Sequence, residues 1–403
     1  MRILHIAQSL SGGGVSNVII NLVKAFHKHD IENVIVTPRV SNTYHRLLRE
    51  ICAVEKIYTL GGDVNPLNSI EYILLTRNHI KEIIKHEKPD AMIIQPGWLS
   101  LYSYLLPYMP TIIVVHGTYL NEIKYMRYHP IHGLERIRYI TGIPLSQAIE
   151  TFQLKIAASR DNTIIVAVSN NTKKELITMD IDPRKVISVL NGVDKELFKP
   201  MDKEHVRALI EEWFGVELRD KVLLHVNPGP RKGTHILIKA IAQLKKIYGR
   251  DFTLLIVGRL GPKIYKEYVE EMIGDLRLEK NVKMLGYVKD KKLPILYNAA
   301  DLTVVPSYSE GSPLVIPESL ACNTPVVATG VGGNPEYLTL AGLENLIVPL
   351  SNYDFSFELA LKIIKALDNI RPFQLIVPNW LDISKIYLRL LRILTDSHSL
   401  LLS

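Results

Sequence analysis

Short apolar runs rich in β-branched residues recur along the chain, and longer stretches of helical period separate them. The run Thr111–Val115 is apolar throughout rather than alternating, as expected for a strand buried on both faces. Between residues 234 and 247, apolar side chains return every three or four positions, which predicts an amphipathic helix. The alternation of the two patterns predicts an α/β architecture with parallel sheets.

The apolar runs predict strands in both halves of the chain. We expect strands near residues 2–7, 33–37, 91–95, 111–115, 163–168, 186–190, 222–226, 252–257, 282–285, 302–305, 325–328 and 345–348. The two halves also begin alike, since ILHIAQSLSGGGVSNVIINLVKAF and VLLHVNPGPRKGTHILIKAIAQL both read as strand, glycine-containing turn and helix. This predicts two doubly wound sheets in tandem, with a junction near 196–205 and a final helix that no strand follows. Ligands bind such sheets at the carboxyl ends of the strands.

Length and composition fit a globular chain of more than one domain. The 403 residues are 47% hydrophobic and 22% charged, without an uncharged apolar run of 18 residues or a signal-peptide pattern. Two cysteines, Cys52 and Cys322, cannot build a disulfide framework or a Cys-rich zinc site, so we expect a reducing, cytoplasmic setting.

The net charge of +7 is scattered, without a run of Lys and Arg. Nucleic-acid binding is therefore not expected. An anionic small molecule and the surface of an anionic membrane explain the sign equally well. Peripheral contact with the inner membrane face thus stays open. The basic, aromatic stretch from Tyr119 to Arg138 fits a flap that faces an acceptor or a membrane, and fits an ordinary solvated surface as well.

The first glycine turn contains Gly13 and Gly14. It follows a strand and opens a helix, so its amides and the helix N-terminus can meet an anion. It fails as a dinucleotide fingerprint, because Asn17 replaces the third glycine and no ribose-binding acid follows Thr37. A plain strand–helix turn remains an equal alternative.

The second turn, residues 228–233, places Arg231 and Lys232 beside amides at the start of a helix. This combination suits a diphosphate, whose charge is met by amides, helix dipole and cations together. It lacks the Walker pattern, and a solvated turn is the alternative.

Two acids stand eight positions apart after a later strand. Glu310 falls in a loop and Glu318 in the helix that follows, and the loop between them offers the amides of Gly311, Ser312 and Leu314. Carboxylates accept hydrogen bonds from paired hydroxyls, so sugar and ribose are natural ligands. An ordinary first-turn helix acid would account for Glu318, but not for Glu310.

At this stretch the sequence resembles retaining glycosyltransferases of family 4, which are known by a signature of two glutamates separated by seven residues. The matching segment is SEGSPLVIPESLACNTPVVATGVGGNPEYL. Further matches, in the family's order, include SGGGVSNVIINLVKAF, VVHGTYL, VLNGVDKELF, RKGTHILIKAI, LLIVGRLGP and VKMLGYV.

The resemblance implies the GT-B fold, in which two Rossmann-like domains face a deep cleft and a C-terminal helix crosses back to the N-domain. Residues 1–200, with the helix 380–403, would bind the acceptor, and residues 201–379 would bind a nucleotide-sugar donor. The acceptor would be a sugar, a lipid-linked molecule or another small molecule. No cofactor and no metal are expected.

The resemblance also implies roles for single residues. Glu318 would hold the ribose hydroxyls and Glu310 the hydroxyls of the transferred sugar, while Lys232 would bind the diphosphate. His116 would lie near the reacting carbon. By the same resemblance, Gly13 and Gly14 would lie close to the phosphates and the acceptor, and the backbone around Tyr287 and Val288 would face the nucleobase.

Departures from the family pattern concern the phosphates and the acceptor. The family's Gly-Arg pair is absent before the Lys-Gly step, where this chain has Asn227-Pro228, and we suggest that Arg231 supplies the missing charge. Ser16 and Asn17 replace an acidic and basic pair, which leaves the acceptor side open. Asp180-Ile181-Asp182 has the spacing of a metal-binding motif of another glycosyltransferase fold, but a turn fits it better.

Three functions remain to be compared. The first is metal-independent transfer of a sugar from a nucleotide diphosphate sugar with retention of anomeric configuration. The second is an epimerase or phosphorylase on the same fold, which the two glutamates together with Lys232 disfavour. The third is a non-catalytic binding module or an NADP oxidoreductase, against which the missing dinucleotide fingerprint counts.

Overall fold

The computed structural model describes residues 1–50, 53–120, 123, 133–350, 354–368, 373 and 376–399. Backbone contacts divide the chain into two compact units. The first unit comprises Met1–Ile123, Ile137–Asn191 and Pro378–Ser403, and the second contains Gly192–Val377. Each unit is an α/β structure built on one parallel sheet, as the alternating pattern predicts.

The first unit carries a sheet of the order β3-β2-β1-β4-β5-β6-β7. Its strands are β1 (Arg2–Ala7), β2 (Glu32–Thr37), β3 (Lys56–Thr59), β4 (Ala91–Gln95), β5 (Thr111–Val115), β6 (Thr163–Ala167) and β7 (Val186–Ser188). Its helices are α1 (Gly14–His27), α2 (Asn42–Glu50), η1 (Pro66–Asn68), α3 (Ser69–Glu87), η2 (Gly97–Leu99), α4 (Tyr102–Leu105), α6 (Gly133–Ala158), α7 (Asn170–Thr178), η4 (Pro183–Lys185) and α15 (Trp380–Ser399).

The second unit carries a sheet of the order β10-β9-β8-β11-β12-β13. Its strands are β8 (Lys221–Val226), β9 (Phe252–Val257), β10 (Val282–Gly286), β11 (Leu302–Val305), β12 (Val326–Thr329) and β13 (Ile347–Val348). Its helices are α8 (Lys203–Phe214), α9 (Thr234–Ile247), α10 (Lys263–Asp275), η5 (Asp290–Lys292), α11 (Leu293–Ala299), α12 (Val315–Ala321), α13 (Asn334–Leu340), η6 (Glu344–Leu346) and α14 (Ser356–Asp368).

The strand order reverses at the same place in both sheets. Two crossovers leave in opposite directions from β1 and β4 in the first sheet, and from β8 and β11 in the second. Such a reversal opens a crevice outside the carboxyl ends of the two central strands, where ligands of doubly wound sheets bind. The loops after β1, β4, β8 and β11 are therefore the places to look for chemistry.

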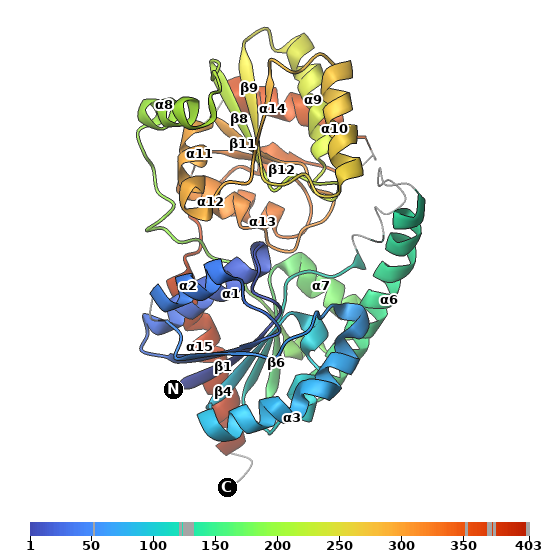
Figure 1. Cartoon of the computed structure of the whole chain (residues 1–403), viewed down its shortest axis with the longest axis vertical. Helices are drawn as coiled ribbons and strands as arrows, with labels where there is room; N and C mark the ends of the chain where they lie inside the picture. The colour runs from blue at the N-terminus through green and yellow to red at the C-terminus, as the bar shows by residue number, and fades with distance from the viewer. Residues whose placement is uncertain are drawn as a thin grey trace. The chain divides into compact units, whose positions relative to one another are not determined.

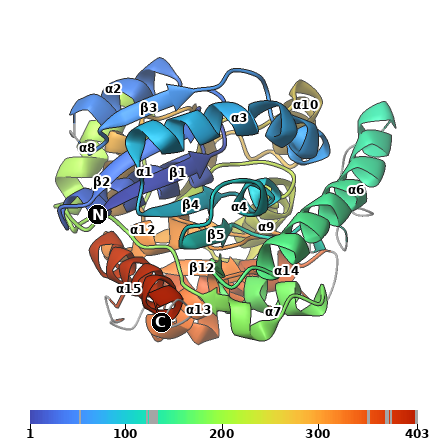
Figure 2. The same cartoon turned by 90° about the horizontal axis from the view of Figure 1, so that it is seen from below.

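The last helix of the chain belongs to the first unit. In Figure 1 the red helix α15 lies among the blue elements of that unit, and in Figure 2 it lies on the far side of the sheet from α3. Tyr387 of α15 packs edge-on against Phe26 of α1, with ring centroids 6.3 Å apart, and both side chains are buried. The helix that the resemblance implies to return to the N-terminal domain is thus confirmed.

The segment before residue 200 is attached to the second unit. Phe198 packs edge-on against Tyr297 of α11 at 5.9 Å between ring centroids. The Asn298 side chain donates to the carbonyl of Lys199 and accepts from the amide of Met201. These contacts explain why the grouping of backbone contacts separates the units after Asn191, a few residues before the expected junction.

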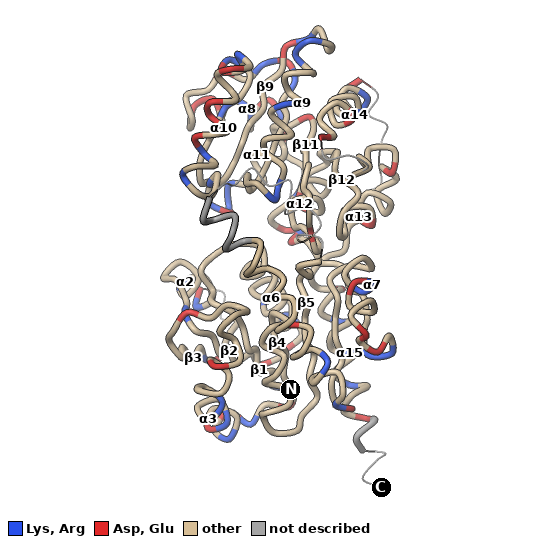
Figure 3. The backbone as a smooth tube through the Cα atoms, turned by 90° about the vertical axis from the view of Figure 1, so that its right-hand side faces the viewer, with Lys and Arg blue, Asp and Glu red and all other residues tan. Residues whose placement is uncertain are grey.

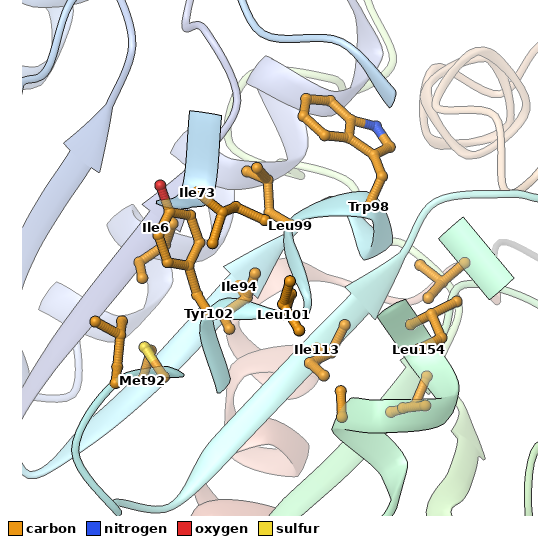
Figure 4. Close-up of a cluster of buried hydrophobic side chains, with 14 of the residues drawn as sticks. Ile6, Ile73, Met92, Ile94, Trp98, Leu99, Leu101, Tyr102, Ile113 and Leu154 are labelled. Carbon is orange, nitrogen blue, oxygen red and sulfur yellow. The ribbon is translucent and has the colours of Figure 1, made fainter. Parts of the chain in front are cut away.

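The core of the first unit shows why apolar runs without alternation form its strands. On β1, Leu4 and Ile6 join a cluster with α3, α4 and α6, while Ala7 faces the cluster formed with α1 and α2. Figure 4 shows the first cluster, where Trp98, Leu99 and Tyr102 surround the sheet residues. Because both faces of the sheet are covered, most positions of its central strands are apolar.

Charged residues lie mainly on the helices that surround the sheets. Acidic and basic residues are interspersed along these helices in both units (Figure 3). No helix within the described residues is long and apolar enough to cross a membrane.

Candidate functional site

The second glycine turn closes the carboxyl end of β8 and is fixed by specific contacts. The Thr234 hydroxyl accepts from the Gly229 amide at 2.9 Å and lies 2.9 Å from Nε2 of the buried His225. Gly233 adopts φ +66°, and a Cβ on it would lie 2.0 Å from the carbonyl oxygen of Pro306. Only glycine therefore lets this turn approach the start of the loop after β11.

Two cations of this turn converge on one acid of the neighbouring loop. Nζ of Lys232 donates to Oε1 of Glu310 at 2.5 Å, and a guanidinium nitrogen of Arg231 lies 3.4 Å from Oε2. The Ser307 hydroxyl also donates to Glu310, at 2.6 Å, and Arg231 donates to the carbonyl of Ser309 at 2.5 Å. Because β8 and β11 are adjacent, this cluster lies at the reversal of strand order.

Glu310 is ionised although it is almost completely buried. Burial by itself would raise its pKa, but the charges of Lys232 and Arg231, with hydrogen bonds from Lys232 and Ser307, lower it to about 2. Burial lowers the pKa of the Lys232 ammonium, and Glu310 opposes that shift. The pair is therefore a buried ion pair.

Glu318 lies one turn into α12 and differs from Glu310 in its surroundings. Its carboxylate accepts one hydrogen bond, of 2.8 Å, from the hydroxyl of the buried Tyr297. Burial raises the pKa of Glu318 to about 7, and Tyr297 only partly counteracts it. The residue as a whole is partly exposed.

The loop between the two glutamates is held in place by contacts with residues 332–337. The Gly333 amide donates to the carbonyl of Gly311 at 2.7 Å, and a Cβ on Gly332 would lie 2.1 Å from the carbonyl oxygen of Glu310. The Ser312 hydroxyl lies 2.6 Å from the hydroxyl of Tyr337 on α13. Gly311, Ser312 and Leu314 are thus held on one rigid loop beside the two acids.

The segment expected to face a nucleobase follows β10. The Gly258 amide donates to the carbonyl of Gly286 at 2.7 Å, which joins the loops after β9 and β10. Tyr287 is 63% exposed and Val288 is buried. The guanidinium of Arg259 lies over the Tyr287 ring, 5.8 Å from its centroid.

In the first unit, the expected residues again lie at carboxyl ends of strands. Gly13 precedes α1 with φ +86°, and both it and Gly14 are exposed. His116 directly follows β5, and its Nε2 lies 2.9 Å from Oε1 of Gln95, the last residue of β4. Burial lowers the pKa of His116 to about 4, so its imidazole is neutral at physiological pH.

Behind His116 lies a buried acid that sequence reasoning did not single out. Glu150 on α6 is 2% exposed, and its Oε1 would lie 2.7 Å from a Cβ on Gly97. Its Oε2 and Nε2 of Gln95 have no hydrogen-bond partner in the part of the chain that the structure describes. Burial raises the pKa of Glu150 to about 8.

Other groups that sequence reasoning missed are Arg259, Ser307 and Tyr297. Ser307 stands inside the punctuated stretch after β11, so its position alone could have drawn attention to it. Tyr297 carries no such signal, because it reads as an ordinary apolar position of a helix. The basic flap proposed for Tyr119 to Arg138 falls mostly outside the described side chains.

The aspartate pair of the possible metal motif serves local structure. Asp182 caps a short helix by accepting from the amide of Arg184 at 2.9 Å, and it also pairs with that guanidinium. Asp180 pairs with Lys155. Within the described residues, no three His, Cys, Asp or Glu side chains group together as metal ligands do.

Two family models match successive parts of the chain. Residues 12–197 match the model described as Glycosyltransferase Family 4, and residues 190–370 match the model described as Glycosyl transferases group 1. The two glutamates and Lys232 fall in the second match, and His116 falls in the first.

Curated relatives match over part of their length. A D-inositol 3-phosphate glycosyltransferase of Corynebacterium glutamicum is 34% identical over 182 residues, which are 43% of this chain and 43% of that protein. One of Mycobacterium marinum is 26% identical over 246 residues, 60% of this chain and 47% of that protein. The chain thus spans half or less of the length of these curated relatives.

Solved structures match over almost the whole chain. Anabaena Alr3699/HepE in complex with UDP and glucose superposes with a TM-score of 0.69 at 21% identity, covering 98% of this chain and 99% of that one. Sucrose-phosphate synthase of Thermosynechococcus elongatus superposes with a TM-score of 0.71 at 18% identity, covering 98% of this chain and 99% of that one. These likenesses show the fold and confirm the GT-B architecture. With the two family models together matching residues 12–370, the chain belongs to the family 4, group 1 glycosyltransferases.

Proposed function

We propose that the protein transfers a sugar from a nucleoside diphosphate sugar to an acceptor hydroxyl, with retention of configuration and without a metal ion. The observation that carries this proposal is the convergence of Lys232, Arg231 and Glu310 at the reversal of strand order, with Glu318 on the following helix. Cations for a diphosphate and carboxylates for hydroxyls stand side by side there.

Each part of the donor has a matching group. Lys232 and Arg231, with the amides at the start of α9, bind the diphosphate, whose charge the helix N-terminus also favours. Glu318 accepts from the ribose hydroxyls and Glu310 from hydroxyls of the sugar. The edge around Tyr287 and Val288 faces the nucleobase. Because a solved structural neighbour contains UDP and glucose, UDP-sugars are the donors to test first.

The reaction exchanges one bond at the anomeric carbon. The bond from this carbon to the diphosphate oxygen breaks, and a bond to the acceptor oxygen forms on the same face of the sugar. The departing diphosphate oxygen takes the proton of the acceptor hydroxyl. Lys232 and Arg231 stabilise the negative charge that grows on the leaving group, a contribution that is typically large in enzymes.

His116 acts as a neutral group in this scheme. With its pKa near 4 it carries no charge at pH 7, and because its Nε2–H donates to Oε1 of Gln95, Nδ1 is left as an acceptor that does not repel an oxocarbenium-like sugar. Gln95 fixes the ring, since the amide and the imidazole nitrogen are 2.9 Å apart. We propose that His116 polarises the reacting centre and exchanges no proton.

Our proposal of metal independence is supported by the positive charges of the site. Elsewhere a divalent cation neutralises a diphosphate, and here a lysine, an arginine, loop amides and a helix N-terminus supply the positive charge. Curated relatives that match part of the chain are named D-inositol 3-phosphate glycosyltransferases. We therefore include phosphorylated and unphosphorylated cyclitols, with simple sugars and lipid-linked sugars, among the acceptors to test.

The test uses UDP-, GDP- and ADP-sugars with these acceptors, in buffer containing a chelator. Donors are ranked by thermal shift, because a ligand that binds the folded protein raises its melting temperature. We expect an α-linked donor to give an α-linked product by NMR with the chelator present. A β-linked product, or activity that needs added Mg²⁺ or Mn²⁺, would overturn the mechanism, and recovery of an epimerised donor would identify an epimerase.

We expect the protein to work in the cytoplasm. Sedimentation with vesicles of anionic and of zwitterionic lipid tests the alternative of peripheral membrane contact. Binding to anionic vesicles that fades with salt would support that alternative.

A further inference from the structure

Glu310 is the feature that carries a further inference. Its carboxylate pairs with both cations assigned to the diphosphate, at 2.5 Å from Lys232 and 3.4 Å from Arg231. The side chain is 5% exposed, and Ser307 fills a further acceptor position at 2.6 Å. Within the described residues, these partners of the buried carboxylate belong to the second glycine turn, residues 228–233, or to the loop that contains Glu310 itself.

The same donors cannot serve both anions fully. The N–H groups of Lys232 and Arg231 that now point at Glu310 are the ones a diphosphate needs. If they turn to phosphate, Glu310 keeps only Ser307 and becomes a buried carboxylate with unfilled acceptor positions, which is costly. Its negative charge then also repels the diphosphate across a partly desolvated site.

We propose that Glu310 makes this site discriminate against diphosphates that carry no sugar. A sugar nucleotide brings hydroxyls that donate to Glu310 and replace the partners it loses. A free nucleoside diphosphate, or inorganic pyrophosphate, brings none, so it competes with Glu310 for the cations and binds less tightly. The inference rests on the proposed function. It adds that Glu310, which binds hydroxyls of the transferred sugar, also promotes release of the nucleoside diphosphate after transfer.

Glu318 shows why this role belongs to Glu310 alone among the two acids. The Glu318 carboxylate accepts from the Tyr297 hydroxyl at 2.8 Å, whereas Lys232 and Arg231 pair with Glu310. Ribose is present in donor and product alike, so a ribose-binding acid cannot tell them apart. Only the acid that pairs with the phosphate cations can couple sugar recognition to diphosphate affinity.

The experiment measures affinities for inorganic pyrophosphate, UDP and UDP-glucose by calorimetry at low salt. Pyrophosphate carries neither base nor sugar, so its affinity is independent of which nucleotide the protein prefers. In Glu310→Gln we expect pyrophosphate and UDP to bind about tenfold more tightly, because the competing charge is gone. UDP-glucose should gain less than UDP or bind more weakly, so its preference over UDP shrinks.

Three variants control the result. Glu310→Asp keeps the charge and should leave pyrophosphate affinity near that of the wild type. Asp251→Asn removes an exposed carboxylate that pairs with Arg219 at 2.7 Å, at the amino end of β9, and should change nothing. Glu310→Ala provides a second neutral replacement if the Glu310→Gln variant has a much lower melting temperature than the wild type.

The outcomes separate the inference from the proposed function. Unchanged or weaker pyrophosphate binding in both neutral variants would overturn the inference. The proposed function would still stand if Lys232→Ala weakens pyrophosphate and the wild type uses a sugar nucleotide. A wild type that binds no nucleoside diphosphate and no sugar nucleotide would overturn both.

Discussion

The two sheets present opposite chemistry at the carboxyl ends of their strands. In the second unit, the loops after β8 and β11 carry a buried ion pair, Lys232 with Glu310, and a second cation, Arg231. In the first unit, the loops after β4 and β5 carry neutral groups, the amide of Gln95 and an imidazole whose pKa lies near 4. The same fold thus supports a charged edge, formed by the loops after β8 and β11, and a neutral edge, formed by the loops after β4 and β5.

The difference lies in what surrounds each buried acid. Glu310 has cationic partners, and its pKa is lowered to about 2. Glu150 lies beside Gly97 and has no cationic partner among the described residues that shifts its pKa, and burial raises that pKa to about 8. Two acids of similar burial therefore have opposite charge states at pH 7. The charged edge suits an anionic donor, and the neutral edge suits a hydroxyl acceptor.

The largest expected effect comes from removing the cation of the charged edge. Lys232→Ala should lower kcat/KM for sugar transfer about a hundredfold or more, roughly 3 kcal/mol of transition-state stabilisation. Arg231→Ala should cause a further loss if it supplies the charge of the missing family arginine. Steady-state kinetics measure both, and Lys155→Ala, which removes an exposed lysine of the first unit, is the control. Wild-type turnover in Arg231→Ala would remove Arg231 from the diphosphate site.

The next effect concerns the backbone that brings the two loops together. Gly233→Ala introduces a Cβ 2.0 Å from the Pro306 carbonyl oxygen at a positive φ, so the turn must move. We expect a loss of about 1–3 kcal/mol in stability and strongly reduced donor binding. Gly249→Ala is a matched control, since it has a similar φ of +68° but no atom near the added Cβ. Equal donor affinity in the two variants would contradict the close approach.

The third prediction uses the pKa of Glu318, which lies near 7. If the ionised carboxylate accepts from the ribose hydroxyls as proposed, UDP affinity should rise about tenfold from pH 6 to pH 8 as the acid deprotonates. Calorimetry at each pH measures this rise. In Glu318→Gln the affinity should be low and the rise should be reduced to the part due to the phosphate itself. An identical pH dependence in both proteins would rule out this role.

The smallest expected effect lies at the neutral edge and concerns stability. Glu150 has a folded pKa of about 8, above the ordinary value of 4.5, so the folded protein binds more protons than the unfolded chain between these pH values. Stability contributed by this group is therefore lost as pH rises from about 4.5 to 8. Glu150→Gln should raise the melting temperature by several degrees at pH 8 and change it little at pH 5. A gain that is equal at both pH values would show that Glu150 does not titrate in this range.

Much of the fold could be predicted from the sequence, because buried parallel strands are apolar throughout. Every strand expected from the apolar runs is present within a few residues. The strand β3, Lys56–Thr59, was missed, because it lies at the edge of its sheet, pairs only with β2, and is half-exposed. An edge strand of four residues with a lysine and a threonine has no buried pattern to detect.

The site could be predicted only in part. Lys232 and Glu310 were named from their motifs, but they are 78 positions apart, and their pairing depends on β8 and β11 being neighbours. The buried acid Glu150 could not be found, because a single glutamate on a helix reads as a solvated position. Which charges are paired, and which are neutralised by burial, is decided by strand order and packing rather than by local sequence. The donor, acceptor and catalytic roles of these residues stay predictions until the variants are measured.

The position of α15 has a consequence for the order in which the molecule is completed during synthesis. Most of the second unit is drawn from the stretch Gly192–Val377, but the first unit needs α15, whose Tyr387 packs against Phe26, to cover α1 and β5. During synthesis, most of the first unit is translated before the second. The apolar surface of α1 and β5 that α15 contacts should therefore stay uncovered until α15 has been made. Nascent-chain aggregation and chaperone capture should concentrate on that surface, although its residues are among the first to be made.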